Sequence, residues 1–354
     1  MKIGLITDTH YGVRNDNQVF YPYQEKSNEY YFRQFEKHGV EVIIHPGDLM
    51  DRRKYLNFVT AQELEKSLLD RMTKYPTHII CGNHDVYYKN TNEINSLNVV
   101  LGKYDFNVYT GPQEIELGGT KILLLPWINQ SNQEESVQMI KDTTASICIG
   151  HLEIAGFEMH TGSKCEHGLD YSLFEKFNLV ISGHFHHRSH YGPVNYIGAA
   201  YEYTWADFND PRGVSILDTE TLDLTFIQNP YTLFKVYRYD DVHAMETIQN
   251  DLEKKDFSKY KDCYVKVLVE NKEHPYTFDM ILDALHDASP ANLKIAENMN
   301  YLVDEMDEID EVEDTKDIMD KYIDAMGMEQ NKSKRVKSLM HELYQEAISL
   351  ENVE

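Results

Sequence analysis

The stretch Ile3-Gly4-Leu5-Ile6-Thr7-Asp8-Thr9-His10 decides the fold class, because an apolar run leads directly into an aspartate and a histidine. Four further apolar segments end in the same way, in polar residues that follow a glycine. These later motifs are Gly47-Asp48, Gly82-Asn83-His84-Asp85, Gly150-His151 and Gly183-His184-Phe185-His186. Apolar runs bounded by glycine are typical of buried strands in an α/β sheet. The carboxyl ends of parallel strands face one crevice, so we expect the five motifs to meet there.

The polar residues at these expected strand ends form a set of metal ligands. Aspartate, asparagine and histidine collect there without cysteine, which suits hard or borderline divalent metals. Asp8 and His10 lie two residues apart, as do His184 and His186, so in extended backbone the members of each pair point to the same side. We assign the ligands as Asp8, His10 and His186 for one ion, Asn83, His151 and His184 for a second ion, and Asp48 as the bridge. Two metal ions held side by side hydrolyse phosphate esters, so the sequence predicts a phosphoesterase centre.

His84 and Asp85 are predicted to serve the chemistry rather than to bind metal. Asn83 takes the ligand role in its motif, which leaves the His84 imidazole to stabilise the transition state or to protonate the leaving oxygen. Asp85 is expected to hold that ring in the useful tautomer. His45 and His187 are expected to be bystanders. Each motif alone is a weak signal, so the prediction depends on all five occurring in order.

Composition sets bounds on the class of protein. The chain of 354 residues is long enough for two or three domains, and a hydrophobic content of 42% suits a sizeable core. The four cysteines lie far apart with no CxxC spacing, which is typical of reduced thiols in a cytosolic protein. No apolar run approaches the length of a membrane span, and the chain begins directly with an expected strand. We therefore expect a soluble cytoplasmic protein.

The charge of the chain bears on its partners. A net charge of −25 argues at first sight against a nucleic acid. Residues 301–320 hold ten acids and one lysine, so part of this charge is local, and bound cations would remove the repulsion between ligand carboxylates. Candidates for phosphate contacts are Arg14, Arg52, Arg53, Lys54, Lys89 and Arg188 near the motifs, and Lys254, Lys255, Lys259 and Lys261 further along the chain.

Strand and helix signals divide the chain into parts. The clearest helix is expected from Phe58 to Met72, and another from about Ser27 to Lys37. The predicted parts are a first domain over residues 1–230, a small α+β unit over 231–300, an acidic linker over 301–316 and two amphipathic helices over 317–354. Such short helices cannot bury their apolar faces alone. They therefore pack on the body of the protein or dock a partner.

The order of the five motifs resembles that of the calcineurin-like metallophosphoesterases over residues 1 to about 200. More narrowly, Gly150-His151-Leu152-Glu153, Tyr196-Ile197-Gly198 and Asn209-Asp210-Pro211-Arg212-Gly213 are similar to the SbcD-type DNA double-strand-break repair nucleases, those of T-even-type bacteriophages included. The resemblance implies an α/β fold, a two-sheet sandwich flanked by helices, with a small α+β capping domain and C-terminal helices. It also implies a manganese-dependent DNA nuclease, a homodimer through helices of the nuclease domain, and terminal helices that bind the coiled-coil base of an SbcC-type ATPase.

One residue departs from the family pattern. Many cellular members carry histidine where this chain has Asp51, so the role of a second non-ligand histidine cannot be transferred to this chain.

Other functions compete with the nuclease. The chief alternative is a phosphomonoesterase or small-molecule phosphodiesterase with the same two-metal site, using Mn²⁺ or Mg²⁺. A third is a scaffold that binds and regulates an ATPase. The 120-odd residues after Pro230 favour the nuclease, because a minimal phosphatase does not need them.

Overall fold

The computed structural model describes residues 1–160 and 163–296, together with a few residues between 323 and 343. The side chain of residue 160 is not among the described ones. The predicted acidic linker over 301–316 lies outside the described residues, as does most of the predicted helical segment over 317–354. None of the described helices is long and apolar enough to cross a membrane.

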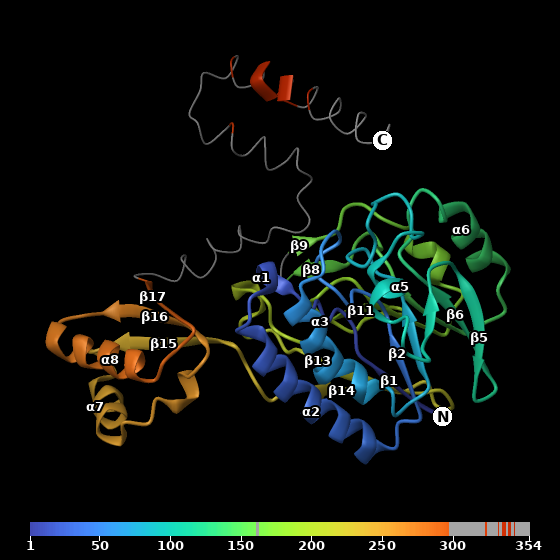
Figure 1. Cartoon of the computed structure of the whole chain (residues 1–354). Coiled ribbons are helices and arrows are strands. Elements are labelled where there is room, and N and C mark those ends of the chain that lie inside the picture. Colours follow the sequence, from blue (N-terminus) through green and yellow to red (C-terminus); the bar gives the residue numbers. More distant parts are fainter. Residues whose placement is uncertain are drawn as a thin grey trace. The chain divides into compact units, whose positions relative to one another are not determined.

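Two six-stranded sheets form the body of the protein (Figure 1). The first sheet has the order β14 (Leu224–Gln228), β13 (Gly213–Asp218), β1 (Lys2–Leu5), β2 (Val42–His45), β3 (Thr77–Ile80) and β4 (Asn107–Tyr109). The second has the order β11 (Ser189–Tyr191), β12 (Val194–Tyr196), β10 (Leu179–Gly183), β7 (Ile147–His151), β6 (Thr120–Leu125) and β5 (Gln113–Leu117). From β1 to β4, and from β12 to β6, neighbouring strands run parallel, so their carboxyl ends share an edge.

Apolar side chains from both sheets form the central core. Ile44 of β2 and Ile80 of β3 belong to the same fully buried cluster as Ile149 of β7 and Ile181 of β10. The strands that precede the predicted metal ligands therefore share one hydrophobic core. This arrangement confirms the predicted two-sheet α/β sandwich.

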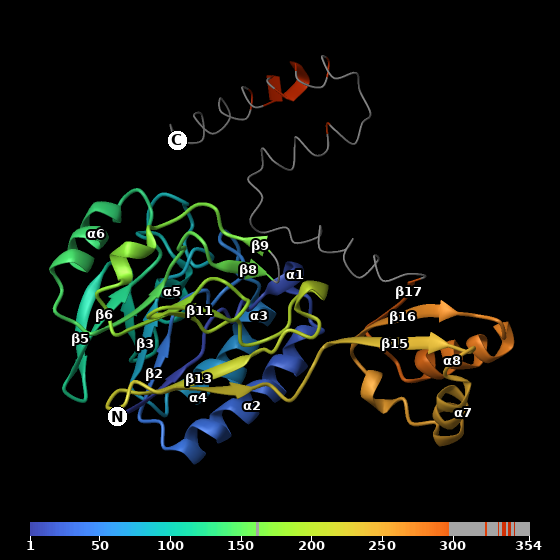
Figure 2. The same cartoon turned by 180° about the vertical axis from the view of Figure 1, so that it is seen from behind.

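Six helices in the described part of residues 1–230, the first predicted domain, accompany the two sheets. They are α1 (Val13–Asp16), α2 (Phe20–His38), α3 (Phe58–Leu64), α4 (Asp70–Met72), α5 (Ser96–Val100) and α6 (Gln133–Asp142). A π-helical turn over Glu65–Leu69 joins α3 to α4, so the helix predicted from Phe58 to Met72 is confirmed. The helix predicted from Ser27 begins earlier, at Phe20, and Pro22 stands in its first turn, where a missing N–H is tolerated. The opposite view in Figure 2 shows α6 beside β5 and β6.

A smaller sheet follows the sandwich. Its elements are β15 (Phe234–Asp240), α7 (Met245–Lys254), β16 (Tyr264–Asn271), α8 (Pro275–Asp287) and β17 (Asn292–Ala296), with a separate core around Val265, Val267 and Ile281. The three strands run parallel, so the unit is an alternating βαβαβ arrangement rather than the expected α+β segregation. The remaining short elements are β8 (Glu158–His160), β9 (Ser163–Lys164) and 3₁₀ turns at Tyr171–Phe174, Trp205–Asp207 and Ser258–Tyr260. A domain boundary at residue 230 stays a prediction.

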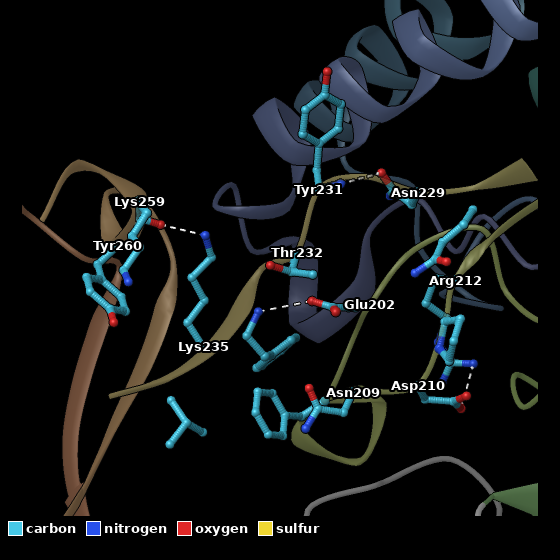
Figure 3. Close-up of a pocket in the computed structure, with 15 residues that line it drawn as sticks. Glu202, Asn209, Asp210, Arg212, Asn229, Tyr231, Thr232, Lys235, Lys259 and Tyr260 are labelled. Carbon is cyan, nitrogen blue, oxygen red and sulfur yellow. Dashed lines mark hydrogen bonds and ion pairs between the residues drawn. The ribbon is translucent and has the colours of Figure 1, made fainter. Parts of the chain in front are cut away.

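A buried carboxylate holds the segment that leads into β15. Glu202 accepts hydrogen bonds from the backbone N–H groups of Leu233 (2.6 Å) and Phe234 (3.0 Å). Glu202 lines a pocket of about 480 Å³ together with Arg212 and Lys235. Figure 3 shows these side chains. Burial raises the pKa of Glu202 to about 7, although the two N–H donors oppose the shift. The charge state of this carboxyl therefore changes near neutral pH.

Candidate metal centre

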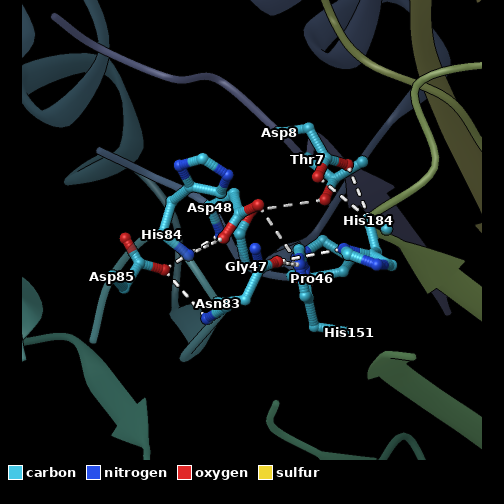
Figure 4. A network of polar contacts seen from close by, with 12 residues as sticks. Thr7, Asp8, Pro46, Gly47, Asp48, Asn83, His84, Asp85, His151 and His184 are labelled. Carbon is cyan, nitrogen blue, oxygen red and sulfur yellow. Dashed lines mark hydrogen bonds and ion pairs between the residues drawn. The ribbon is translucent and has the colours of Figure 1, made fainter. Parts of the chain in front are cut away.

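The predicted ligands follow strands of both sheets and meet at one edge of the sandwich. Asp8, Asp48 and Asn83 each come three residues after β1, β2 and β3, while His151 ends β7 and His184 follows β10 directly. Figure 4 shows their side chains converging. The structure therefore brings together residues that are far apart in the chain.

The backbone at this edge is not extended, which corrects one step of the sequence argument. Asp8, His10, Asp48 and His184 all have positive φ, at 49°, 38°, 55° and 84°. This region is sparsely populated by residues other than glycine, and such strain gathers at functional sites. The pairing of Asp8 with His10 was expected from strand alternation, but the left-handed turns of the loop bring the two side chains together instead.

The first group of candidate ligands consists of Asp8, His10 and His186. One donor atom from each lies within 4.8 Å of the others. The Nε2 atoms of His10 and His186 are 3.0 Å apart, although the residues are separated by 176 positions, so at most one proton fits between them. The Tyr203 hydroxyl donates to the backbone carbonyl of Asp8 at 2.6 Å and fixes this loop.

The second group consists of Asn83, His151 and His184, with Asp48 between the groups. The Asn83 Oδ1 atom lies 2.8 Å from His151 Nε2 and 3.0 Å from His184 Nδ1. The Asp48 Oδ2 atom lies 3.2 Å from His151 Nε2 and 3.7 Å from His10 Nε2. One carboxylate oxygen thus reaches toward both groups, which is the geometry that a bridging ligand needs.

The electrostatics of the centre fit divalent cations. Burial raises the pKa of Asp8, and the nearby charge of Asp48 adds to that effect. Burial would also raise the pKa of Asp48, but His151 and His84 outweigh it and hold that pKa well below its usual range. Burial lowers the pKa of His151, yet Asp48 and Asp8 raise it to about 9. Two buried carboxylates thus depend on nearby protons for compensation, and cations would replace those protons.

His84 follows the ligand Asn83, and both its backbone and its ring have polar partners. Its backbone N–H donates to Asp48 Oδ1 at 2.8 Å, and its Nδ1 lies 2.8 Å from the Asp51 carbonyl. A carbonyl only accepts, so Nδ1 carries the proton and Nε2 has the lone pair in the neutral ring. Burial lowers the pKa of His84 to about 4, against the opposing effect of Asp48. His84, His10 and Asp48 also form a third cluster of potential ligand atoms, so the non-ligand role of His84 stays a prediction.

Asp85 has a different partner from the one expected. Its carboxylate accepts four backbone N–H groups, from Asp48 and Gly82 at 2.9 Å and from Leu49 and Met50 at 3.1 Å. The prediction that Asp85 orients the His84 ring is wrong, because the Asp51 carbonyl contacts Nδ1 of that ring. Asp85 instead ties the Gly-Asp loop to the Gly-Asn-His-Asp loop.

Glycine in these motifs is explained by close approach of the loops. A Cβ atom on Gly82 would lie 2.2 Å from Asp48 Oδ1 and 2.4 Å from its backbone nitrogen. On Gly183 it would lie 2.3 Å from the Thr7 hydroxyl oxygen. No real Cβ contact is this short, so glycine is needed where the loops meet.

Two histidines expected to be bystanders have structural partners. His45 is buried between the Thr9 hydroxyl (3.1 Å) and the Gly47 N–H (3.3 Å), and burial lowers its pKa to about 3. His187 lies 2.8 Å from an Asp210 carboxylate oxygen.

Sequence reasoning gave no role to Asp51 and Glu153, whose carboxylates lie beside ligand histidines. The available signal was their position in the chain, since Asp51 follows the ligand Asp48 by three residues and Glu153 follows the ligand His151 by two.

Comparison with known proteins shows the family of the chain. The family model described as calcineurin-like phosphoesterase matches residues 1–188. The chain is 36% identical over 243 residues to "Exonuclease subunit 1" of Enterobacteria phage T4, which covers 68% of this chain and 71% of that protein. It is 22% identical over 344 residues to the SbcD subunit of the SbcCD nuclease from Staphylococcus saprophyticus, which covers 86% of this chain and 89% of that protein. The chain therefore belongs to the calcineurin-like phosphoesterase family.

Proposed function

We propose that this chain is a manganese-dependent DNA nuclease that hydrolyses phosphodiester bonds and works with an SbcC-type ATPase in recombination, double-strand-break processing and replication. The observation that carries the proposal is the position of the Asp48 carboxylate between two groups of ligands. The relatives named as nuclease subunits support a nucleic acid as the substrate.

The ligand assignment follows from the contacts described above. Asp8, His10 and His186 would hold one ion, Asn83, His151 and His184 the other, and Asp48 both. When bound, two ions polarise a phosphoryl oxygen and lower the pKa of water. Four of these side chains are imidazoles, and nitrogen donors favour manganese over magnesium, which prefers oxygen.

His84 would act on the leaving oxygen. In the substrate-free protein its ring is neutral at pH 7, because burial lowers its pKa to about 4. An approaching phosphodiester anion favours the protonated ring, which keeps Nδ1–H on the Asp51 carbonyl and presents Nε2–H to the substrate. His84 would then donate that proton as the bond to the leaving oxygen breaks.

Three arginines near the centre are engaged within the protein. Arg52 is held by Asp16 at 2.8 Å, and Arg14 lies over the rings of Phe234 and Tyr264. Arg188 stacks 3.5 Å from the centre of the Phe226 ring. These contacts make the three arginines weaker candidates for binding the DNA backbone.

Two lysines close in sequence to the ligands are candidates for contacts to the DNA backbone, beside Lys254, Lys255, Lys259 and Lys261. Lys54 and Lys89 are exposed, and each follows a ligand, Asp48 or Asn83, by six residues. Lys54 lies 5.5 Å from the centre of the Tyr87 ring, a loose contact that a phosphate can replace. Both lysines would contact phosphates on either side of the scissile bond.

Partner contacts are proposed for two other parts of the chain. Phe58 of α3 and Val99 of α5 are 85% and 74% exposed, which supports a homodimer through helices of the nuclease domain. Residues 317–350, largely outside the described ones, would bind the coiled-coil base of the ATPase. Truncation after Asp314 should leave manganese nuclease activity intact and abolish ATPase association. Unchanged co-purification with the ATPase would contradict this docking role.

One assay separates the competing functions. The purified chain with manganese is tested on supercoiled plasmid, linear duplex DNA and a small aryl phosphate. The proposal predicts cleavage of DNA at rates well above hydrolysis of the aryl phosphate. Preference for the aryl phosphate would favour a phosphomonoesterase or small-molecule phosphodiesterase, and inactivity on all three would favour a scaffold.

A further inference from the structure

A metal-binding imidazole uses one ring nitrogen for the ion, and its other nitrogen needs a partner that fixes the ring. For His151 that partner is a backbone carbonyl, because its Nδ1 lies 2.9 Å from the oxygen of Pro46. Two other ligand histidines face carboxylates instead. His10 Nδ1 lies 3.3 Å from Asp51 Oδ1, and His184 Nε2 lies 3.4 Å from Glu153 Oε2.

We propose that Asp51 and Glu153 are positioning residues, one for each ion, which hold His10 and His184 so that His10 Nε2 and His184 Nδ1 face the metals. The proposal rests on the two-metal centre proposed above. It extends that centre to two side chains that bind no metal and touch no substrate.

The tautomer of each ring follows from the chemistry of its partner. Both contacts are close approaches of charge, and the one between His10 Nδ1 and Asp51 Oδ1 lacks hydrogen-bond geometry. An ionised carboxylate attracts an N–H group and repels a lone pair, so it favours a proton on the ring nitrogen that faces it. The opposite nitrogen then has its lone pair available for a metal. That opposite nitrogen is His10 Nε2, which lies near Asp48 and His186, and His184 Nδ1, which lies near Asn83. Both nitrogens therefore point at the ligand groups to which the rings were assigned.

Asp51 serves two histidines at once. Its carboxylate faces His10, while its carbonyl contacts Nδ1 of His84 at 2.8 Å. The residue is buried, and its own backbone N–H donates to the Tyr11 carbonyl at 3.0 Å, so it has little freedom to move. This is the position at which the chain departs from the histidine of the related family. Aspartate here supplies a negative charge beside His10 that a histidine cannot supply.

Glu153 is placed by the strand that carries another ligand. It follows His151, the last residue of β7, by two positions, and its backbone carbonyl accepts the Leu169 N–H at 2.8 Å. The side chain is about one-third exposed, and its carboxylate lies on the side of the His184 ring away from Asn83. Glu153 thus connects the end of β7 to the ligand that follows β10.

Losing such a partner lowers metal affinity about 10–100-fold in comparable sites. The test is calorimetric Mn²⁺ titration of the full chain without DNA, together with electron paramagnetic resonance, in which a manganese pair differs from an isolated ion. Glu153→Leu and Asp51→Leu should each weaken one of two binding steps by that factor. Glu153→Gln and Asp51→Asn keep an acceptor oxygen and should retain most of the manganese affinity of the wild type. If a leucine variant fails to fold, the corresponding amide variant takes its place in the test.

A second measurement asks whether each carboxylate acts through its own histidine. In a His184→Ala background, Glu153→Leu should change manganese affinity no further, whereas in a His10→Ala background it should still weaken binding. Glu158→Leu is the matched control, because Glu158 lies 3.6 Å from His187, which is not an assigned ligand. This control should leave both binding steps unchanged.

The possible failures are distinguishable. Unchanged affinities in both leucine variants would overturn the positioning roles and leave the two-metal centre intact. Equal loss of both ions in either single variant, or further loss from Glu153→Leu in the His184→Ala background, would also overturn them. Fewer than two ions on the wild-type chain would refute the centre itself. Because no DNA is present, a wrong substrate assignment affects none of these results.

Discussion

Replacing Asp85 by asparagine tests whether one carboxylate holds the two central loops together. Each oxygen of Asp85 accepts two backbone N–H groups, at distances between 2.9 and 3.1 Å. In Asp85→Asn one oxygen becomes an NH₂ group, so two N–H donors face another donor whichever way the amide is turned. A buried donor left unsatisfied costs about 1–3 kcal/mol, so the variant should lose about 2–6 kcal/mol.

That loss is a large part of a typical unfolding free energy of about 5–15 kcal/mol. Because the two loops carry Asp48 and Asn83, manganese affinity should fall as well. Burial, and next the charge of Asp48, raise the pKa of Asp85 to about 6, so urea unfolding is measured at pH 8, where the carboxyl is ionised. Asp170→Asn is the control, since Asp170 is an exposed carboxylate that accepts one N–H, from Ser172 at 2.8 Å. A loss below about 1 kcal/mol in Asp85→Asn, with unchanged manganese binding, would refute the reasoning.

Three further predictions concern other residues. His84→Gln should keep both manganese ions while the DNA cleavage rate falls about 10²–10⁴-fold, the usual range for a lost general acid; loss of metal would refute the non-ligand role. Glu202→Gln should flatten the pH dependence of stability between pH 4.5 and 7, because burial raises the pKa of Glu202 to about 7 and the native carboxyl holds its proton longer than the unfolded one. The stability of the wild type relative to this variant should therefore fall across this range, by ~3 kcal/mol at most, and parallel urea-midpoint curves of the two proteins would refute the assignment. Lys54→Ala with Lys89→Ala should reduce the salt dependence of DNA binding by about two phosphate contacts, and an unchanged slope would exclude both lysines.

The sequence predicted the parts of the structure that depend on pattern. Apolar runs such as Ile147 to Ile149 became fully buried strands, and the polar residues after them met at one edge, because strand direction determines where their ends lie. The sequence also showed the alternating strand and helix signals from β15 to β17. It did not show that the three strands run parallel, so the unit was expected to be α+β.

The parts that could not be predicted depend on contacts between loops. The left-handed backbone of Asp8 and His10 arises where their loop meets the one carrying Asp48, whose carbonyl accepts both the Thr9 and His10 N–H groups. The four N–H partners of Asp85 come from two loops, so nothing local to Asp85 indicates them. The early start of α2 at Phe20 goes with the burial of its aromatic residues Phe20, Tyr21 and Tyr23, which propensity does not predict.

The number of manganese ions bound per chain tests the central claim most directly. Native mass spectrometry and equilibrium dialysis at saturating manganese measure it without reference to any substrate. The geometry around Asp48 predicts two ions on the wild-type chain, and loss of both in Asp48→Ala at the same metal concentration. A single ion on the wild-type chain, or two ions retained in Asp48→Ala, would contradict the bridged two-metal centre.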